Sequence, residues 1–181
     1  MEQGAILGTI GLFCVLIIIL IVSFMGGEEN TYITIAQNAT YGEMYYHNHT
    51  GTTLNFAVDS FYYTLWFTEA EHLSGFTFNA GNPYNSNLTV DVGGLYLVNW
   101  QASGSGQNNH EYYTTVFVNE TDFEECETHH KMSTGGDIIT QHGTCTLNLT
   151  VGDRVTVRTA DIGDTGDGVY YSGGLYITSI H

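Results

Sequence analysis

Basic residues are almost missing from this chain. Its 181 residues include three Lys or Arg against 19 Asp or Glu, which gives a formal net charge of -16 at pH 7. A surface of this charge repels phosphate backbones and anionic lipid headgroups, so nucleic-acid binding is excluded. We interpret the acidity as a device for solubility, suited to a saline medium, in preference to dedicated cation binding.

The sequence also lacks the motifs of the common enzyme classes. It contains no nucleophile elbow, no P-loop, no dinucleotide fingerprint and no H-E-x-x-H zinc motif. Hydrophobic heptads and collagen-like triplets are missing as well, so no long stalk is expected. We therefore expect a protein that is not an enzyme.

Cysteine is scarce, and the three cysteines divide into two groups. Cys14 lies in an apolar segment, whereas Cys126 and Cys145 are left as a pair in the polar part of the chain. An even pair predicts a disulfide if this part occupies an oxidising compartment. The alternative, zinc held by Cys126 with His129 and His130, is disfavoured because neighbouring residues of a strand point to opposite faces.

One long apolar run stands near the N-terminus. Ala5 to Met25 is 21 residues without a charge, and as a helix it would cover about 30 Å, the hydrocarbon thickness of a bilayer. A cleaved signal peptide is the alternative. It is disfavoured because the only charge before the run is Glu2 and no A-x-A-like cleavage site follows it. We expect a retained transmembrane helix in contact with membrane lipid.

This helix divides the chain into three parts. Residues 1–27 form the predicted anchor, 28–41 a short linker with a candidate strand at Thr31 to Ile35, and 42–181 the ectodomain. Five N-x-Thr sequons support an external location for the C-terminal domain, on a cell or virion surface, and are candidate glycosylation sites. They are Asn38, Asn48, Asn87, Asn119 and Asn148.

Beyond the linker, the sequence consists of short β-branched and aromatic runs broken by Gly, Asn and Asp. This pattern predicts an all-β, antiparallel sandwich or barrel whose only companion helix is the anchor. In one run, Tyr96, Val98 and Trp100 share a face that must be core or subunit interface. The expected strands are 42–46, 53–58, 64–67, 76–78, 88–92, 94–102, 112–118, 137–149, 154–159 and 174–180.

The order of four motifs resembles the C1q/TNF-like jelly roll, over residues 42–181. It is especially similar to compact trimeric heads of this type on viral and phage surface proteins and on bacterial outer-layer filaments. The motifs are Gly94-x-Tyr96-x-Val98-x-Trp100, Val116-Phe117-Val118-Asn119, Leu149-x-x-Gly152-Asp153-x-Val155 and Leu175-Tyr176-Ile177-Thr178-Ser179-Ile180.

The resemblance implies a ten-strand, two-sheet jelly roll that forms a homotrimer through aromatic contacts between subunits. With so short a linker, three anchor helices would enter the membrane close together, which makes Gly4 and Gly8 candidates for the helix contact. The aromatic residues expected in the trimer contact or in the core are Tyr62, Trp66, Tyr96, Trp100 and Tyr170.

A glycine-rich loop carries the remaining candidate site. Asp161, Asp164 and Asp167 are three carboxylates that could fold around calcium, the one cofactor that the sequence suggests. The alternative is an ordinary Asp-Gly turn between strands.

Together these features predict a membrane-anchored, non-enzymatic surface protein whose trimeric jelly-roll head serves as a spike, coat or attachment module, with a receptor or glycan as partner. Two alternatives remain. One is a filament or surface-layer subunit that adds Thr31 to Ile35 to a neighbour as a strand. The other is a calcium-assisted carbohydrate-binding module.

Overall fold

The computed structural model describes residues 39–58, 61–81, 85–133, 136–163 and 166–180. The predicted anchor helix, Gly4, Gly8, the candidate strand at 31–35, Asn38 and Asp164 lie outside these ranges. Residues 40–181 form one compact unit. Within the described ranges no helix is long and apolar enough to span a membrane.

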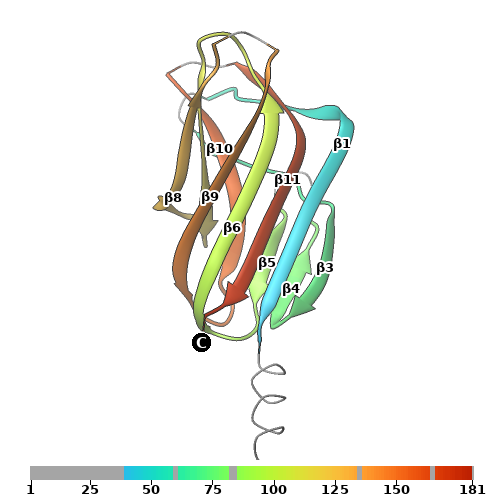
Figure 1. Cartoon of the computed structure of the whole chain (residues 1–181), viewed down its shortest axis with the longest axis vertical. Coiled ribbons are helices and arrows are strands. Elements are labelled where there is room, and N and C mark those ends of the chain that lie inside the picture. Colours follow the sequence, from blue (N-terminus) through green and yellow to red (C-terminus); the bar gives the residue numbers. More distant parts are fainter. Residues whose placement is uncertain (1–38, 59–60, 82–84, 134–135, 164–165, 181) are drawn as a thin grey trace, which may run out of the picture. The chain divides into compact units, whose positions relative to one another are not determined.

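The described residues form eleven antiparallel strands in two sheets that pack face to face (Figure 1). The first sheet has the order β3-β1-β11-β6-β9. The second has the order β4-β5-β10-β7-β8, with β2 also paired to β10. The strands are β1 (Tyr41–Asn55), β2 (Tyr63–Thr64), β3 (Glu69–Ser74), β4 (Phe76–Asn79), β5 (Asn87–Val90), β6 (Gly94–Ser105), β7 (Glu111–Val118), β8 (Thr121–Lys131), β9 (Ile138–Leu149), β10 (Arg154–Ile162) and β11 (Asp167–Ser179).

The core lies between the sheets, where alternate side chains of both inner faces meet. On β6 the predicted alternation is confirmed: Tyr96, Val98 and Trp100 are buried, and the residues between them face outward. The opposing sheet contributes Val155 and Val157 of β10, which are fully buried. Tyr96 and Trp100 are therefore core residues of a single chain.

The observed strands differ from the expected ones in two ways. Two observed strands were not expected, and two strands that were expected separately form a single strand. Residues 42–46 and 53–58 were predicted as separate strands, but β1 runs continuously from Tyr41 to Asn55 past a register shift after His47. The strands β3 and β8 were missed because their sequences are rich in charged residues. Both are edge strands, largely exposed, and so show no apolar alternation.

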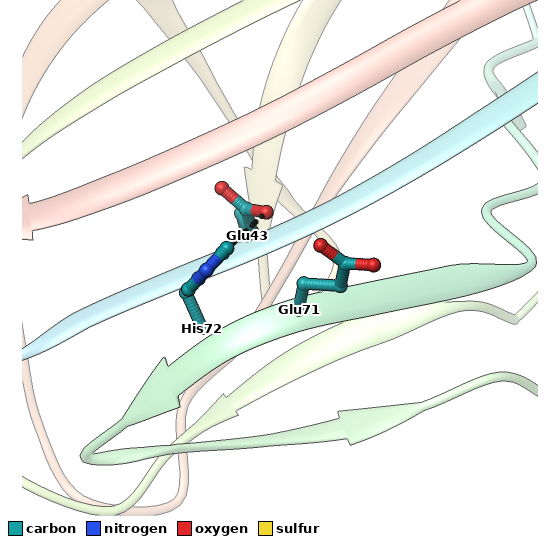
Figure 2. Close-up of side chains that lie close together, drawn as sticks. All are labelled: Glu43, Glu71 and His72. Atoms are coloured by element: carbon teal, nitrogen blue, oxygen red, sulfur yellow. Dashed lines mark hydrogen bonds and ion pairs between the residues drawn. The ribbon is translucent and has the colours of Figure 1, made fainter.

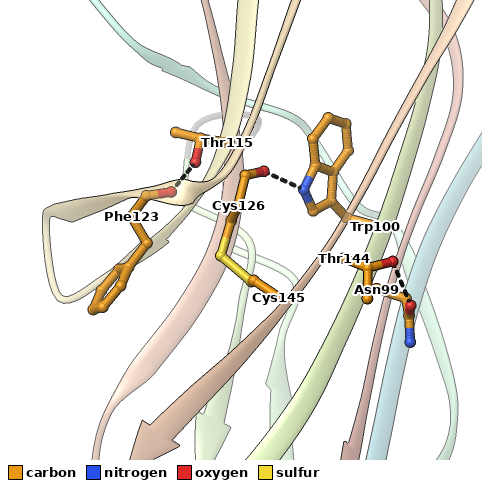
Figure 3. The surroundings of a disulfide bond; sticks show 7 residues. All are labelled: Asn99, Trp100, Thr115, Phe123, Cys126, Thr144 and Cys145. Carbon is orange, nitrogen blue, oxygen red and sulfur yellow. Dashed lines mark hydrogen bonds between the residues drawn. A yellow bond between two sulfur atoms is a disulfide. The ribbon is translucent and has the colours of Figure 1, made fainter.

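The predicted disulfide between Cys126 and Cys145 is present and joins the two sheets (Figure 3). Cys126 belongs to β8, an edge of the second sheet, and Cys145 to β9, an edge of the first. Their Cα atoms are 5.1 Å apart, and both side chains are buried. The indole Nε1 of Trp100 donates to the carbonyl of Cys126 at 2.9 Å, so the bridge is packed against the largest core residue. Because its sulfur is bonded to Cys145, Cys126 has no thiolate to offer a zinc ion.

A bulge in β8 aims Cys126 inward. The ladder between β7 and β8 is interrupted between the pairs Thr114 with Thr128 and Val116 with Phe123. The Thr115 hydroxyl donates to the Phe123 carbonyl at 2.8 Å at this irregularity. The β8 residues between the two pairs leave the regular ladder, which allows Cys126 to reach β9.

Candidate functional site

The outer face of the first sheet carries no charge across three neighbouring strands. Backbone pairing places β6 between β11 and β9, so the outward side chains of these strands form one surface. We call it the uncharged face, and none of its members is Asp, Glu, Lys or Arg. It consists of Leu95, Leu97, Asn99, Gln101 and Ser103 of β6, Thr140, His142, Thr144, Thr146 and Asn148 of β9, and Ser172, Gly174, Tyr176 and Thr178 of β11.

This lack of charge distinguishes the face from the rest of a strongly acidic protein. The strand β8 alone carries four carboxylates and one lysine, and β1 and β3, beside the uncharged face, carry Glu43, Glu69 and Glu71. Surfaces of soluble proteins normally mix charges throughout. Depletion of charge over a contiguous patch is instead characteristic of the centre of a protein interface.

Large apolar side chains gather at one end of the uncharged face. Leu95 and Leu97 of β6 and Tyr176 of β11 are each 37–47% exposed, and so are Tyr41 and Ile180 in adjoining positions. The backbone amide of Ile180 donates to the Leu95 carbonyl, and Tyr41 pairs with Thr178, which pairs with Leu97. The five side chains therefore lie near one another at one end of the sheet, and exposed apolar side chains gathered in this way are typical of a contact surface.

The polar part of the uncharged face is ordered by its own hydrogen bonds. The Thr144 hydroxyl donates to Asn99 Oδ1 at 2.8 Å across the pair of β9 and β6. A hollow of about 200 Å³ opens here, lined by Asn99, Gln101, His142, Thr144 and Tyr176 together with Trp100 and Gly143. Uncharged amides and hydroxyls around a small hollow suit the side chains of another protein surface.

The other predicted aromatic residues are not members of the uncharged face. Tyr62 donates to Glu127 at 2.6 Å, and Trp66 stacks on Tyr46, with 6.3 Å between ring centroids. Tyr170 donates to Thr159 at 2.8 Å. Each is half-buried. The sequence predicts aromatic residues in the contact between subunits. In the structure, the exposed apolar residues of the uncharged face include Leu95 and Leu97 of β6, which alternate with core residues along the strand.

The sequons lie at several different places. Asn148 lies on the uncharged face, in the pair with Leu95. Asn119 is exposed, but its side-chain Nδ2 donates to Asp153 Oδ1 at 2.6 Å. Its side-chain Oδ1 accepts from the backbone amide of Arg154. Asn48 accepts from Thr50 within its own turn, and Asn87 lies on β5. Glycosylation of these residues stays a prediction.

The acidic loop is only partly described. Asp161 ends up fully buried near the end of β10, where Oδ2 lies 2.6 Å from His110 Nδ1 and accepts from the Gly166 amide at 3.1 Å. Asp167 is exposed at the start of β11. No sequence motif indicates this contact, because the pattern does not show that β10 would bring Asp161 beside His110. Calcium binding by the loop stays a prediction.

The structure also brings together Glu43, Glu71 and His72, which no sequence motif connects (Figure 2). One carboxylate or ring atom from each lies within 4.8 Å of the others, so the three side chains could hold a metal ion. Adjacent strand residues normally point to opposite faces, but His72 has a φ of 50° within a bulge of β3. Such a bulge cannot be located from sequence alone.

His72 should titrate above the usual range of histidine. Its Nδ1 lies 3.1 Å from Glu43 Oε1, and this hydrogen bond, followed by the charge of Glu43, raises the pKa of His72 above 6.5. The folded state then binds the proton more tightly than the unfolded state. The resulting stabilisation is present below pH 6.5 and is lost as the pH rises through the raised pKa.

We expect Glu43→Gln to return the pKa of His72 toward 6.5 in an NMR titration of its ring protons. Glu69→Gln is the matched control, since Glu69 lies on the same strand as His72 and is not among the causes of its raised pKa. An unchanged pKa in the Glu43 variant would show that the pair does not form in solution.

Comparisons with known proteins agree with the architecture. No protein-family model and no curated protein matches the sequence. Two solved structures are similar in fold. One is the structure of Eiger TNF from S. frugiperda, with a TM-score of 0.53 and 14% identity over 78% of this chain and 94% of that one. The other is the globular domain of zebrafish complement 1qA protein, with a TM-score of 0.53 and 14% identity over 80% and 98%. The described domain therefore has the C1q/TNF-like jelly-roll fold.

Proposed function

We propose that this protein is a non-enzymatic, membrane-anchored surface protein whose jelly-roll head assembles as a homotrimer through the uncharged face. The observation that carries the proposal is the charge-free outer surface of β11, β6 and β9 in a chain of net charge -16. Mutual repulsion between identical acidic subunits is weakest where they meet without charge.

A second copy of this chain is the occupant that the face favours. The face pairs an apolar end at Leu95, Leu97 and Tyr176 with a hydrogen-bonding end, and this mixture is typical of an interface between protein subunits. The C1q/TNF-like fold supports three copies around an axis. In that arrangement a glycan on Asn148 would project between subunits, so the proposal requires Asn148 to be unmodified in the assembled protein.

The anchor and the external location form the second part of the proposal. They rest on the apolar run from Ala5 to Met25, on the disulfide, which requires an oxidising compartment to persist, and on the sequons. In this arrangement the head presents its surface to the outside, as a spike, coat or attachment module.

Both parts can be tested on the full chain. Lys131 is the only lysine and is exposed on β8. A membrane-impermeant amine reagent should therefore modify Lys131 on intact cells that display the protein, as read by peptide mass spectrometry. Labelling only after the membrane is permeabilised would contradict the external location. Extraction into detergent should yield particles with three chains each, and a single chain per particle would contradict the assembly.

A further inference from the structure

A groove crosses the outer face of the second sheet, on the other side of the sandwich from the uncharged face. Its floor includes Arg154, Thr156 and Arg158 of β10, which alternate with the buried core residues of that strand. Two hollows, of about 200 and 400 Å³, share four lining residues and therefore adjoin. The shared residues are Thr64, Asn85, Glu120 and Arg158.

Positive charge is concentrated in this groove. Arg154 and Arg158 are two of the three cationic side chains of the whole protein, and the third, Lys131, is not among the lining residues. Glu120 is the one carboxylate among the lining residues described. In a chain of net charge -16, two arginines against one lining carboxylate make this groove locally favourable for an anionic group.

The side chain of Arg158 is held in place before any ligand binds. Its Nη2 lies 2.7 Å from Glu120 Oε2, and its guanidinium carbon lies 4.4 Å from the centre of the Phe117 ring. Arg154 is exposed at the open end of the floor. A fixed guanidinium beside an exposed one suits a carboxylate, because the planar fork of arginine matches both carboxylate oxygens.

The larger hollow adds an aromatic wall. It is lined by Phe61, Tyr62 and Tyr63 in addition to Asn55 and the shared residues. The ring centroids of Tyr62 and Phe117 are 5.1 Å apart, and the Tyr62 hydroxyl donates a hydrogen bond to Glu127. Phe61 is 55% exposed and packs edge-on against Tyr63. Rigid aromatic rings offer flat apolar contact, and amide and hydroxyl side chains beside them fix the orientation of a bound molecule.

These features together favour one class of ligand. A simple anion would bind the arginines but make no contact with the aromatic wall. A neutral sugar could contact the aromatic wall but would carry no negative charge to pair with the arginines. We propose that the groove binds a saccharide that carries a carboxylate, with the carboxylate on Arg154 and Arg158 and a sugar ring against Tyr62 and Tyr63. This goes beyond the proposed assembly, because it uses the opposite sheet.

The test uses the full chain in micelles of zwitterionic detergent, produced without N-glycans because the sequon residue Asn87 lines the smaller hollow. Digalacturonate is the probe, and galactobiose is its neutral counterpart. We expect digalacturonate to bind in titration calorimetry and to perturb NMR signals of the Tyr62 and Tyr63 rings. Arg154→Gln should weaken binding at least tenfold. Lys131→Gln removes the same charge outside the groove and should change affinity less than twofold.

Several results would overturn the proposal. Equal binding of galactobiose would remove the role of the carboxylate, and equal losses in the two charge variants would reduce the interaction to net charge. Full competition by inorganic phosphate without any change at the tyrosine rings would show that only an anion is bound. Leu97→Glu, on the uncharged face, should leave the affinity unchanged, which separates a failure of this proposal from a failure of assembly.

Discussion

Replacing Cys126 and Cys145 together by alanine is expected to lower the melting temperature of the domain by roughly 10 °C. The bridge closes a loop with a sequence separation of 19 residues. A loop of about this length contributes about 3 kcal/mol through the entropy of the unfolded chain. For a domain of this size, each kcal/mol corresponds to about 3 °C. Calorimetry of the domain under non-reducing conditions measures the shift.

Reductant supplies a control that changes no atom of the folded core except the bridge. Wild-type protein in dithiothreitol should melt close to the double variant, and the double variant should not respond to reductant. The variant Cys14→Ala, outside the domain, should melt like the wild type. A wild-type protein that melts at the same temperature with and without reductant would contradict the structural role assigned to the bridge.

Leu97→Glu is expected to convert the assembled head into single chains. Leu97 is 37% exposed and lies between Thr178 and Thr146 on the uncharged face, so an isolated domain can accept a charge there with little loss of stability. In the assembly, three carboxylates would be removed from water near one another and near the existing acidic surface. An unpaired buried charge costs several kcal/mol, which is enough to dissociate a complex of micromolar affinity.

Val151→Glu is the matched control for this change. Val151 is 69% exposed, lies in the turn between β9 and β10, and is not part of the uncharged face. Its replacement adds the same charge to the same chain, so both variants respond equally to any general electrostatic effect. Loss of assembly in both variants, or in neither, would contradict the assignment of the interface to the uncharged face.

The strands that could be predicted are those whose burial leaves a local signature. Along β6, core residues alternate with outward ones, and the predicted strand from Gly94 to Ala102 therefore lies within the observed strand. The order of such strands also suggested the C1q/TNF-like resemblance. The edge strands β3 and β8 have too few buried residues for this signature, and their acidic sequences do not favour strands.

The candidate site depends on information that is not local. The outward residues of β6 form no recognisable motif in the sequence. The strand order is needed to see that they lie beside outward residues of β9 and β11 that are also uncharged. The same holds for the groove, since Arg158 and Tyr62 are brought together by the short pairing of β2 with β10. The disulfide could be predicted because only two cysteines lie outside the apolar segment.

The most direct test of the account is the mass of residues 30–181 in solution, measured by light scattering over a range of concentrations. This fragment contains the whole described core and lacks the anchor, so any assembly must come from the head itself. We expect a species of three chains that dissociates when Leu97→Glu is introduced. A fragment that stays monomeric at every concentration would contradict the account, and so would open-ended polymers, which would instead favour a filament subunit.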